Sequence, residues 1–399
     1  MPFRCPRPAD RAELLARRRN RKMARSAHAY VRGNTGRFYE WLAASAGDSL
    51  PAGPAIWICG DCHVGNLGPL AARDGAVGVQ IRDLDQAVIG NPAHDLIRLG
   101  LSLASACRSA NLPGAVSVRM VEALLDAYAR AFGRRPTPIA PPSAIEVVMR
   151  QALARSWKQL ARDHLSHTRP RIPLGSRFWP LSQRERRAIG EIFDPDALPT
   201  LAARLGLAAP DESVAFSDAA YWVKGCSSLG RLRYAILLEV GAADGKRRMA
   251  MVDMKEAPPA AAPRYEDAPM PRDNAARVVR AASALAPALG ERMAAVRLLE
   301  RPMAMRELLP QDLKIEPDRL PPATIDAIAR YLGQVVGLAH AGQMDADTRH
   351  RWQRELRSSR SKVVDAPSWL WRSIVDALAS HERGYLEHCR RHIATIERR

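Results

Sequence analysis

Two short apolar segments in the first hundred residues each end in a polar turn that carries an aspartate. Residues 55–59 (AIWIC) lead into a glycine-rich turn with Asp61 and Asn66, and residues 77–81 (VGVQI) lead to Asp83. Apolar runs of this length, bounded by turn residues, are typical of buried strands. We therefore expect two strands in this part of the chain, each followed by a polar turn that carries an aspartate.

The apolar periodicity divides the chain into four parts and predicts an α+β fold. Residues 1–50 are basic and helical in pattern, and residues 51–212 combine the polar turns with helices. Residues 213–312 are rich in strand-like runs, and residues 313–399 return to helix with an amphipathic stretch that begins near residue 323. We therefore expect one helical lobe and one β-rich lobe, with the β-rich lobe inserted late in the chain.

The charge balance predicts anionic partners. The 399 residues include 60 Lys and Arg against 42 Asp and Glu, which gives a net charge of +18. Such a field attracts nucleotides, phosphorylated metabolites, acidic surfaces and nucleic acids without choosing among them. A GC-rich coding bias toward arginine is an equally good explanation of part of the excess. No nucleic-acid-binding motif is legible, so a nucleic-acid partner stays open but has no motif to support it.

No stretch of 18 apolar residues exists, so we expect no membrane span, and we expect a cytoplasmic protein because no apolar signal core precedes the helices. The six cysteines are then expected to be reduced thiols. Cys59 and Cys62 form a C-x-x-C, which is compatible with a redox pair or half of a zinc site. A zinc site would need a second ligand pair, and no matching motif stands elsewhere in the sequence.

The residue types around the two turns fit phosphoryl transfer. This chemistry depends on positioning and on charge neutralisation, with a carboxylate beside the attacking hydroxyl and oxygen ligands for Mg²⁺. We expect Asp61 to act as the base, and Asn66 and Asp83 to bind the metal. Asp85 is either a further metal ligand or a structural hydrogen-bonding residue.

Three motifs over about forty residues resemble aminoglycoside and choline phosphotransferases, which belong to the protein-kinase-like superfamily. Gly60-Asp61-x-His63-x-Gly65-Asn66 resembles their catalytic loop, residues 81–85 (IRDLD) look like their metal-binding segment, and residues 90–96 (GNPAHDL) look like the stretch that follows. The resemblance implies that Asp95 supports the loop from a helix. It also implies a hydrogen-bonding role for His63.

The β-rich part resembles the nucleotide-binding elements of kinases. Residues 224–230 (KGCSSLG) look like a phosphate-covering loop, which implies that Gly225, Ser227, Ser228 and Gly230 contact phosphates. Residues 251–255 (MVDMK) resemble the strand whose lysine pairs the α- and β-phosphates, which assigns that role to Lys255. Met305 would lie in the hinge beside the adenine, and Arg32 is a further candidate anion contact.

These motifs stand in an order opposite to that of kinases, with the catalytic loop first and the nucleotide elements second. The resemblance therefore implies a circularly permuted, bilobal kinase-like fold that uses ATP and Mg²⁺. One kinase feature is missing, because the expected helix at 273–286 contains no glutamate to pair with Lys255. Over nearly its full length the chain is also similar to an uncharacterised bacterial family, domain of unknown function 2252, through segments such as 30–33 (YVRG), 255–257 (KEA) and 338–341 (LAHA).

The leading hypothesis is an ATP- and Mg-dependent phosphotransferase that acts on an unidentified hydroxyl acceptor, either a small molecule or a protein, and an acidic acceptor stays open. Transfer of AMP is a variant that the sequence does not separate from transfer of phosphate. An inactive kinase-like module that binds nucleotide or nucleic acid is an alternative, and a metallophosphoesterase is a less favoured one because its further His-rich motifs are missing. Every kinase-like version requires the acidic turns to meet Lys255 across one cleft.

Overall fold

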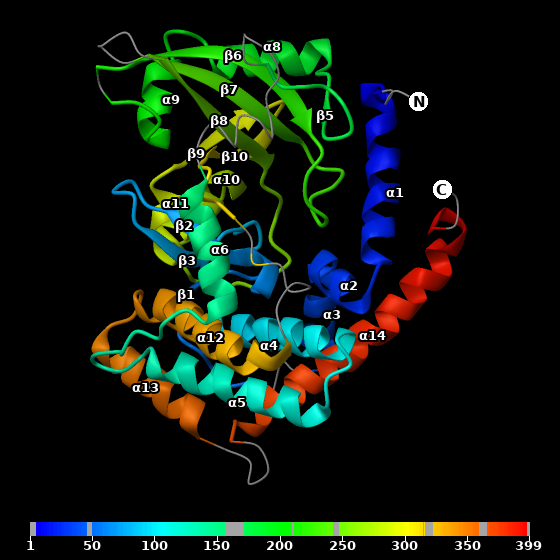
Figure 1. The fold of residues 1–399 in the computed structure, drawn as a ribbon, viewed down its shortest axis with the longest axis vertical. Coiled ribbons are helices and arrows are strands. Elements are labelled where there is room, and N and C mark those ends of the chain that lie inside the picture. The colour runs from blue at the N-terminus through cyan, green and yellow to red at the C-terminus, as the bar shows by residue number, and fades with distance from the viewer. Residues whose placement is uncertain are drawn as a thin grey trace.

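A computed structural model describes residues 5–45, 50–155, 171–209, 211–241, 247–313, 315, 322–358 and 365–396. A six-stranded antiparallel sheet lies at one end of the molecule and a set of packed helices at the other, so the predicted α+β class is confirmed (Figure 1). None of the helices in these ranges is long and apolar enough to cross a membrane.

The large sheet is a mostly sequential meander with one exchange at its edge. Its strands are β5 (Phe178–Trp179), β6 (Ser213–Trp222), β7 (Arg233–Gly241), β8 (Arg247–Glu256), β9 (Met293–Leu298) and β10 (Arg301–Leu308). They lie in the order β5-β6-β7-β8-β10-β9. β7 is buried along most of its length and β8 along its middle, because both are interior strands of the sheet.

Alternation along β8 gives the sheet two chemically different faces. Val252 and Met254 point to an apolar face that is covered by α8 (Gln183–Ile192) and α9 (Leu198–Leu205). Asp253 and Lys255 therefore point to the other face, which looks toward the acidic turns. There α10 (Asn274–Leu285) and the short α11 (Pro287–Gly290) pack beside Ala304.

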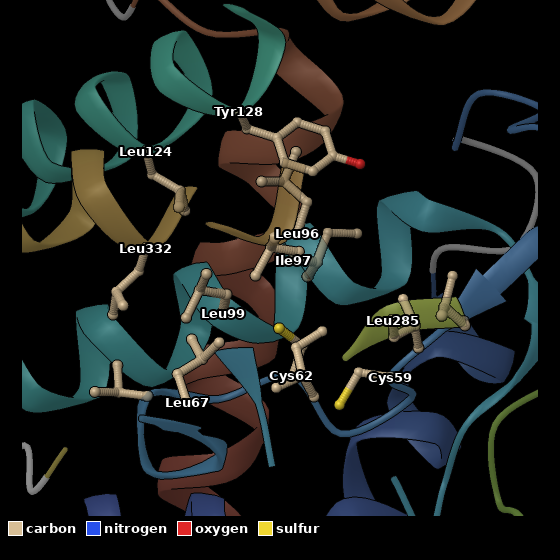
Figure 2. Close-up of a cluster of buried hydrophobic side chains, with 14 of the residues drawn as sticks. Cys59, Cys62, Leu67, Leu96, Ile97, Leu99, Leu124, Tyr128, Leu285 and Leu332 are labelled. Atoms are coloured by element: carbon tan, nitrogen blue, oxygen red, sulfur yellow. The ribbon is translucent and has the colours of Figure 1, made fainter. Parts of the chain in front are cut away.

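The helical end contains one continuous apolar core. It is built from α4 (Pro92–Ser109), α5 (Gly114–Arg130), α12 (Ile325–Ala341), α13 (Ala346–Arg357) and α14 (Ser368–Ile396), with α6 (Ser143–Ala154) running toward the sheet (Figure 1). Leu99, Leu124 and Leu332 belong to this core, and so do the buried side chains of Cys59 and Cys62 (Figure 2). Gly337 permits the close approach of α12 to α5, because a Cβ there would lie 2.8 Å from the Tyr128 carbonyl oxygen.

The N-terminal helices connect the two ends of the molecule. They are α1 (Arg11–Met23), α2 (Ala27–Gly33) and α3 (Thr35–Ser45), and α1 runs beside α14 (Figure 1). A buried ion pair between Arg11 and Glu185, 2.8 Å from Nη1 to Oε1, fastens α1 to the sheet end. The Tyr234 hydroxyl donates to the same carboxylate at 2.9 Å.

Two small two-stranded antiparallel sheets carry the acidic turns. β1 (Ile56–Ile58) pairs with β4 (Val88–Gly90), and β2 (Leu67–Ala71) pairs with β3 (Val77–Ile81). The strands expected at 55–59 and 77–81 are present, but the sequence reasoning assigned the start of β2 to the glycine-rich turn. The Gly-Pro pair inside β2 is a turn signal that a two-stranded hairpin can accommodate.

A buried carboxyl group in β10 makes the stability of this fold depend on pH. Glu307 is 6% exposed, and burial raises its pKa from 4.5 to about 7. The folded state therefore holds a proton that the unfolded chain releases, and stability is lost as the pH rises between these two values. We expect Glu307→Gln to raise the free energy of unfolding at pH 8 by roughly 1–3 kcal/mol and to change it little at pH 5.

Denaturant titrations of both proteins at the two pH values measure this effect. Glu291→Gln is the matched control, because Glu291 is exposed. An equal change at pH 5 and pH 8 would contradict the assignment of the penalty to ionisation of Glu307.

Candidate active site

Asp95 of α4 holds the start of the turn that contains Asp61. Its fully buried carboxylate accepts hydrogen bonds from the backbone N–H groups of Cys59, at 2.6 Å, and Gly60, at 2.9 Å. The His340 ring lies 3.2 Å from the same carboxylate, and its other nitrogen lies 2.8 Å from the Tyr128 hydroxyl. This chain of polar contacts fixes the turn to α12 and α5 in a region of low dielectric constant.

Arg98, one turn further along α4, holds the Asp61 side chain. Its Nε and Nη2 donate to Asp61 Oδ1 at 3.1 and 3.0 Å, and Nη2 also donates to the Val31 carbonyl at 2.6 Å. Ser102, a further turn along, accepts a hydrogen bond from the Val64 N–H at 3.4 Å. Residues three and four apart share one helix face, so a single polar stripe on α4 supports the turn.

The Asp61 carboxylate is buried next to a neutral imidazole. Burial raises the pKa of Asp61, while Arg98 and a hydrogen bond from Thr35 oppose the rise. His63 Nε2 lies 3.8 Å from Asp61 Oδ2, and burial together with the charge of Arg98 holds the pKa of His63 well below its usual range. The Asn66 amide nitrogen donates to the Asp61 backbone carbonyl at 3.0 Å, which leaves the amide oxygen of Asn66 as an acceptor.

Lys255 meets the second acidic turn although the two segments are 172 residues apart in the sequence. Its Nζ lies 3.2 and 3.3 Å from the two carboxylate oxygens of Asp83, and it also forms an ion pair with Asp85. Burial acts to raise the pKa of Asp83, but the positive charge of Lys255 outweighs it and holds that pKa below the usual range. Burial and repulsion by Asp83 raise the pKa of Asp85.

Helix α10, which packs over the Lys255 face, contributes an arginine to the acidic turn. Arg277 of α10 donates to the backbone carbonyls of Asp85 at 3.0 Å and Pro258 at 2.8 Å, and also to the carbonyl of Ala87. The helix therefore positions the acidic turn through its backbone, and the carboxylates of that turn pair with Lys255. This arrangement explains why the sequence of α10 contains no acidic partner for the lysine.

The loop between β6 and β7 covers this region. Gly225 and Gly230 have φ values of +92° and +99°, in the left-handed region that favours glycine. Within the loop, the Ser228 hydroxyl donates to the Lys224 carbonyl at 3.2 Å. Lys22 of α1 donates to the Gly225 carbonyl at 2.7 Å, so the N-terminal helix contacts the loop directly.

Two cavities lie side by side between the acidic turns, the loop and the N-terminal helices. The acidic cavity, of about 420 Å³, is lined by Arg19, Met23, Gly33, Asn34, Thr35, Gly36, Asp61, Asn66, Asp83, Asp85, Gln86, Ser227, Arg231, Pro259 and Ala261. The basic cavity, of about 480 Å³, is lined by Lys22, Arg25, Ser26, Ala29, Arg32, His63, Gly65, Asn66, Arg82, Asp83, Lys224, Gly225, Cys226, Ser227, Ser228, Arg233 and Arg306. Asn66, Asp83 and Ser227 border both and form the wall between them.

Most of the expected site residues therefore line or adjoin the two cavities. Met305 and Gly230 line neither of them. Lys255 lines a smaller space of about 50 Å³ that adjoins the cavities through Asp83. Met305 was expected beside the nucleotide, but it pairs with Met254 in the register of the sheet and is fully buried on the apolar face, opposite Lys255. Gly230 borders a separate cavity with Arg231 and Glu256.

A family model described as "Uncharacterized protein conserved in bacteria (DUF2252)" matches residues 11–391. The chain belongs to this family. No curated protein and no solved structure matches it. The matched range includes both acidic turns, the 224–230 loop and Lys255, so the family model spans every segment that lines the two cavities.

The oxygen donors in this DUF2252 protein fit Mg²⁺. Asp83 and Asp85 contribute carboxylate oxygens and Asn66 an amide oxygen to one cavity. Mg²⁺ usually takes one or two protein carboxylates and completes its shell with waters and phosphates. Within the described ranges, no group of three or more His, Cys, Asp and Glu side chains is arranged to hold a metal ion. Cys59 and Cys62 are buried free thiols.

Sequence reasoning missed several residues of this site. Arg98 has a signal in retrospect, because Asp95, Arg98 and Ser102 recur at helical spacing along an otherwise apolar helix. The basic residues that line the second cavity come from the α1–α2 segment, the turn after β3, the 224–230 loop and the sheet, and no local pattern joins them.

The anchoring of the turn by Asp95 can be tested by removing its charge. We expect Asp95→Asn to lower the free energy of unfolding by about 2–4 kcal/mol, because two buried N–H groups and His340 lose a charged acceptor. Chemical denaturation measures the loss. Asp10→Asn, at an exposed aspartate on the N-terminal segment, is the control that should change stability by less than about 0.5 kcal/mol. Equal effects for the two variants would rule out the anchoring role.

Proposed function

We propose that this protein is an ATP- and Mg-dependent phosphotransferase with a hydroxyl acceptor. The observation that carries the proposal is the contact of Lys255 with Asp83 and Asp85, beside a cavity lined by Asp61. Phosphoryl transfer needs a phosphate-binding cation, carboxylates for the metal and a base for the acceptor within one small volume. These three requirements are met by residues from distant parts of the chain.

In this proposal Asp61 orients the acceptor. Arg98 fixes one carboxylate oxygen, Oδ1, so the other oxygen can accept a hydrogen bond from a hydroxyl bound in the acidic cavity. The raised pKa of Asp61 makes it a better proton acceptor than an ordinary aspartate. His63 stays neutral beside it and adds no competing positive charge.

Asp83, Asp85 and Asn66 would hold Mg²⁺ on the wall between the two cavities, with Lys255 bound to phosphate oxygens. When bound, the metal neutralises negative charge on the phosphoryl group. Lys255 pairs with both carboxylates and Arg231 Nη1 lies 4.0 Å from Asp85 Oδ2, so a divalent cation bound there would replace part of this positive charge. The basic cavity, next to this wall and under the 224–230 loop, offers the positive charge that a phosphate chain requires.

The arrangement of elements supports the kinase-like, circularly permuted interpretation. The β6–β7 loop, Lys255 on β8, helix α10 and the β9–β10 pair follow one another in the order that kinases use for nucleotide binding. The Asp61 turn and Asp83, which come after these elements in kinases, come before them here. Active sites are defined by geometry and not by chain order, so the same chemistry is available.

Removal of either side of the Lys255–Asp83 contact should weaken nucleotide binding. We expect Lys255→Met and Asp83→Asn each to lower the affinity for Mg·ATP by at least about tenfold, because a phosphate contact or a metal ligand is lost. Titration calorimetry in Mg²⁺ measures the affinity, and thermal unfolding verifies that each variant is folded. Asp347→Asn, at an exposed aspartate on α13, is the control. Wild-type affinity in both site variants would refute the proposal.

Loss of the Asp61 charge should separate binding from chemistry. We expect Asp61→Asn to bind Mg·ATP within about twofold of the wild type and to lose Mg-dependent ATP turnover by at least about a hundredfold, because the base acts on the acceptor. Turnover with water as a surrogate acceptor is measured by phosphate release. An unchanged rate would show that Asp61 takes no part in the reaction.

A further inference from the structure

The basic cavity concentrates positive charge beyond what one lysine of a nucleotide site supplies. Seven of its lining residues are cationic: Lys22, Arg25, Arg32, Arg82, Lys224, Arg233 and Arg306. Among the described residues that line it, Asp83 is the single acid. A cavity with cationic walls focuses the field and raises the local concentration of anions.

These cations come from four separate parts of the fold. Lys22, Arg25 and Arg32 belong to the α1–α2 segment, Arg82 follows β3, Lys224 belongs to the loop, and Arg233 and Arg306 come from β7 and β10. A solvated run of charges on one helix would not converge in this way. The sheet arginines are fixed by Asp253, which accepts from Arg233 Nε at 2.8 Å and lies 3.5 Å from Arg306 Nη2.

Two side chains of this cavity, Arg32 and His63, each have a buried nitrogen that makes no hydrogen bond among the described residues. Arg32 packs against Gly65, where a Cβ would lie 2.7 Å from Arg32 Nη2, so the glycine makes room for the guanidinium. The buried Nε of Arg32 and the buried Nδ1 of His63 have no hydrogen-bond partner among the described residues, and His63 is 4% exposed. A buried polar atom without a partner is costly unless a ligand satisfies it.

The cations also repel one another. Burial lowers the pKa of Lys22, and the neighbouring Arg25 and Arg18 lower it further. An anion bound among these side chains would relieve this repulsion, so the cavity is prepared for a ligand with several negative charges.

The cavity lacks a slot for a nucleobase. Among the described residues that line it, the single aromatic ring is the imidazole of His63, which is 4% exposed and lies beside Asp61, and none has a branched aliphatic side chain. Apolar side chains do line the small space behind Lys255, including Val278, Leu289 and Met293, but its volume is about 50 Å³. That is far below the roughly 300 Å³ at which ordinary small-molecule sites begin.

We propose that the basic cavity binds a chain of linked phosphates, and that the phosphoryl donor is recognised through this chain and not through its base. The donor role depends on the proposed phosphotransferase function, whereas the binding site does not. In the transfer step, the terminal P–O bond of the chain breaks and a P–O bond to the acceptor oxygen forms. The acceptor proton passes to Asp61, and the shortened chain leaves with the electron pair of the broken bond.

Titration calorimetry of the full chain in Mg²⁺ tests the proposal with four ligands: ATP, GTP, CTP and inorganic tripolyphosphate. We expect the three nucleotides to bind within about threefold of one another and tripolyphosphate to bind within about tenfold of ATP, because the phosphates supply the contacts. A preference for ATP of more than about tenfold over GTP, CTP or tripolyphosphate would overturn the proposal. Failure of tripolyphosphate to bind would do the same.

Variants locate the binding in the cavity. We expect Lys22→Ala and Arg32→Ala each to weaken tripolyphosphate binding by about tenfold, and Arg32→Lys to weaken it less because the charge is kept. Arg187→Ala removes an exposed arginine of α8 and is the matched control, expected to leave the affinity unchanged. Thermal unfolding verifies the fold of each variant, and wild-type affinity in folded Lys22→Ala and Arg32→Ala would refute this location.

The two proposals fail in different ways. Tripolyphosphate could bind tightly and lose affinity in the cavity variants while no Mg-dependent turnover is detected. This result would support the phosphate-chain site and contradict the proposed phosphotransferase function. Turnover of ATP that tripolyphosphate does not inhibit would support the phosphotransferase function. It would contradict recognition of the donor through its phosphate chain alone.

Discussion

The site depends on one contact, the ion pairing of Lys255 with Asp83 and Asp85. It joins a strand of the large sheet to a turn that precedes it by 172 residues. Because Lys255 is nearly buried, with its side chain 12% exposed, its charge requires these partners. The contact therefore brings the sheet end and the helical end together at the place where both cavities open. Arg277 stabilises the same turn from α10 through backbone carbonyls.

A second layer of support comes from helices that touch neither cavity directly. The polar stripe of α4 holds the Asp61 turn through Asp95, Arg98 and Ser102, and α12 adds His340. The N-terminal helices add further wall residues, since Arg19, Met23 and Thr35 line one cavity and Lys22 and Arg32 line the other. The division into acidic and basic cavities with a shared wall suits a reaction that joins a hydroxyl acceptor to a phosphate donor.

Much of this arrangement follows from local sequence signals. Strand–turn patterns predicted the segments around Asp61 and Asp83, and periodicity predicted α10 and α12, because these depend on residues near in sequence. The placement of Met305 could not be read in this way, since one step along a strand reverses the face that a side chain occupies. The basic cavity is assembled from four distant segments, and only tertiary packing brings them together. Arg98 is an intermediate case. Its helical spacing from Asp95 can be recognised in the sequence, but its contact with Asp61 cannot.

On the proposed function, nucleotide phosphates and Mg²⁺ replace the internal pairing of Lys255 with the acidic turn. A crystal structure with Mg²⁺ and a non-hydrolysable ATP analogue tests it most directly. We predict an Asp83 oxygen at about 2.1 Å from the metal, a typical Mg–O distance, with Lys255 on a phosphate oxygen and the phosphate chain in the basic cavity. A nucleotide bound elsewhere, with Lys255 still paired to Asp83 and Asp85, would contradict the account.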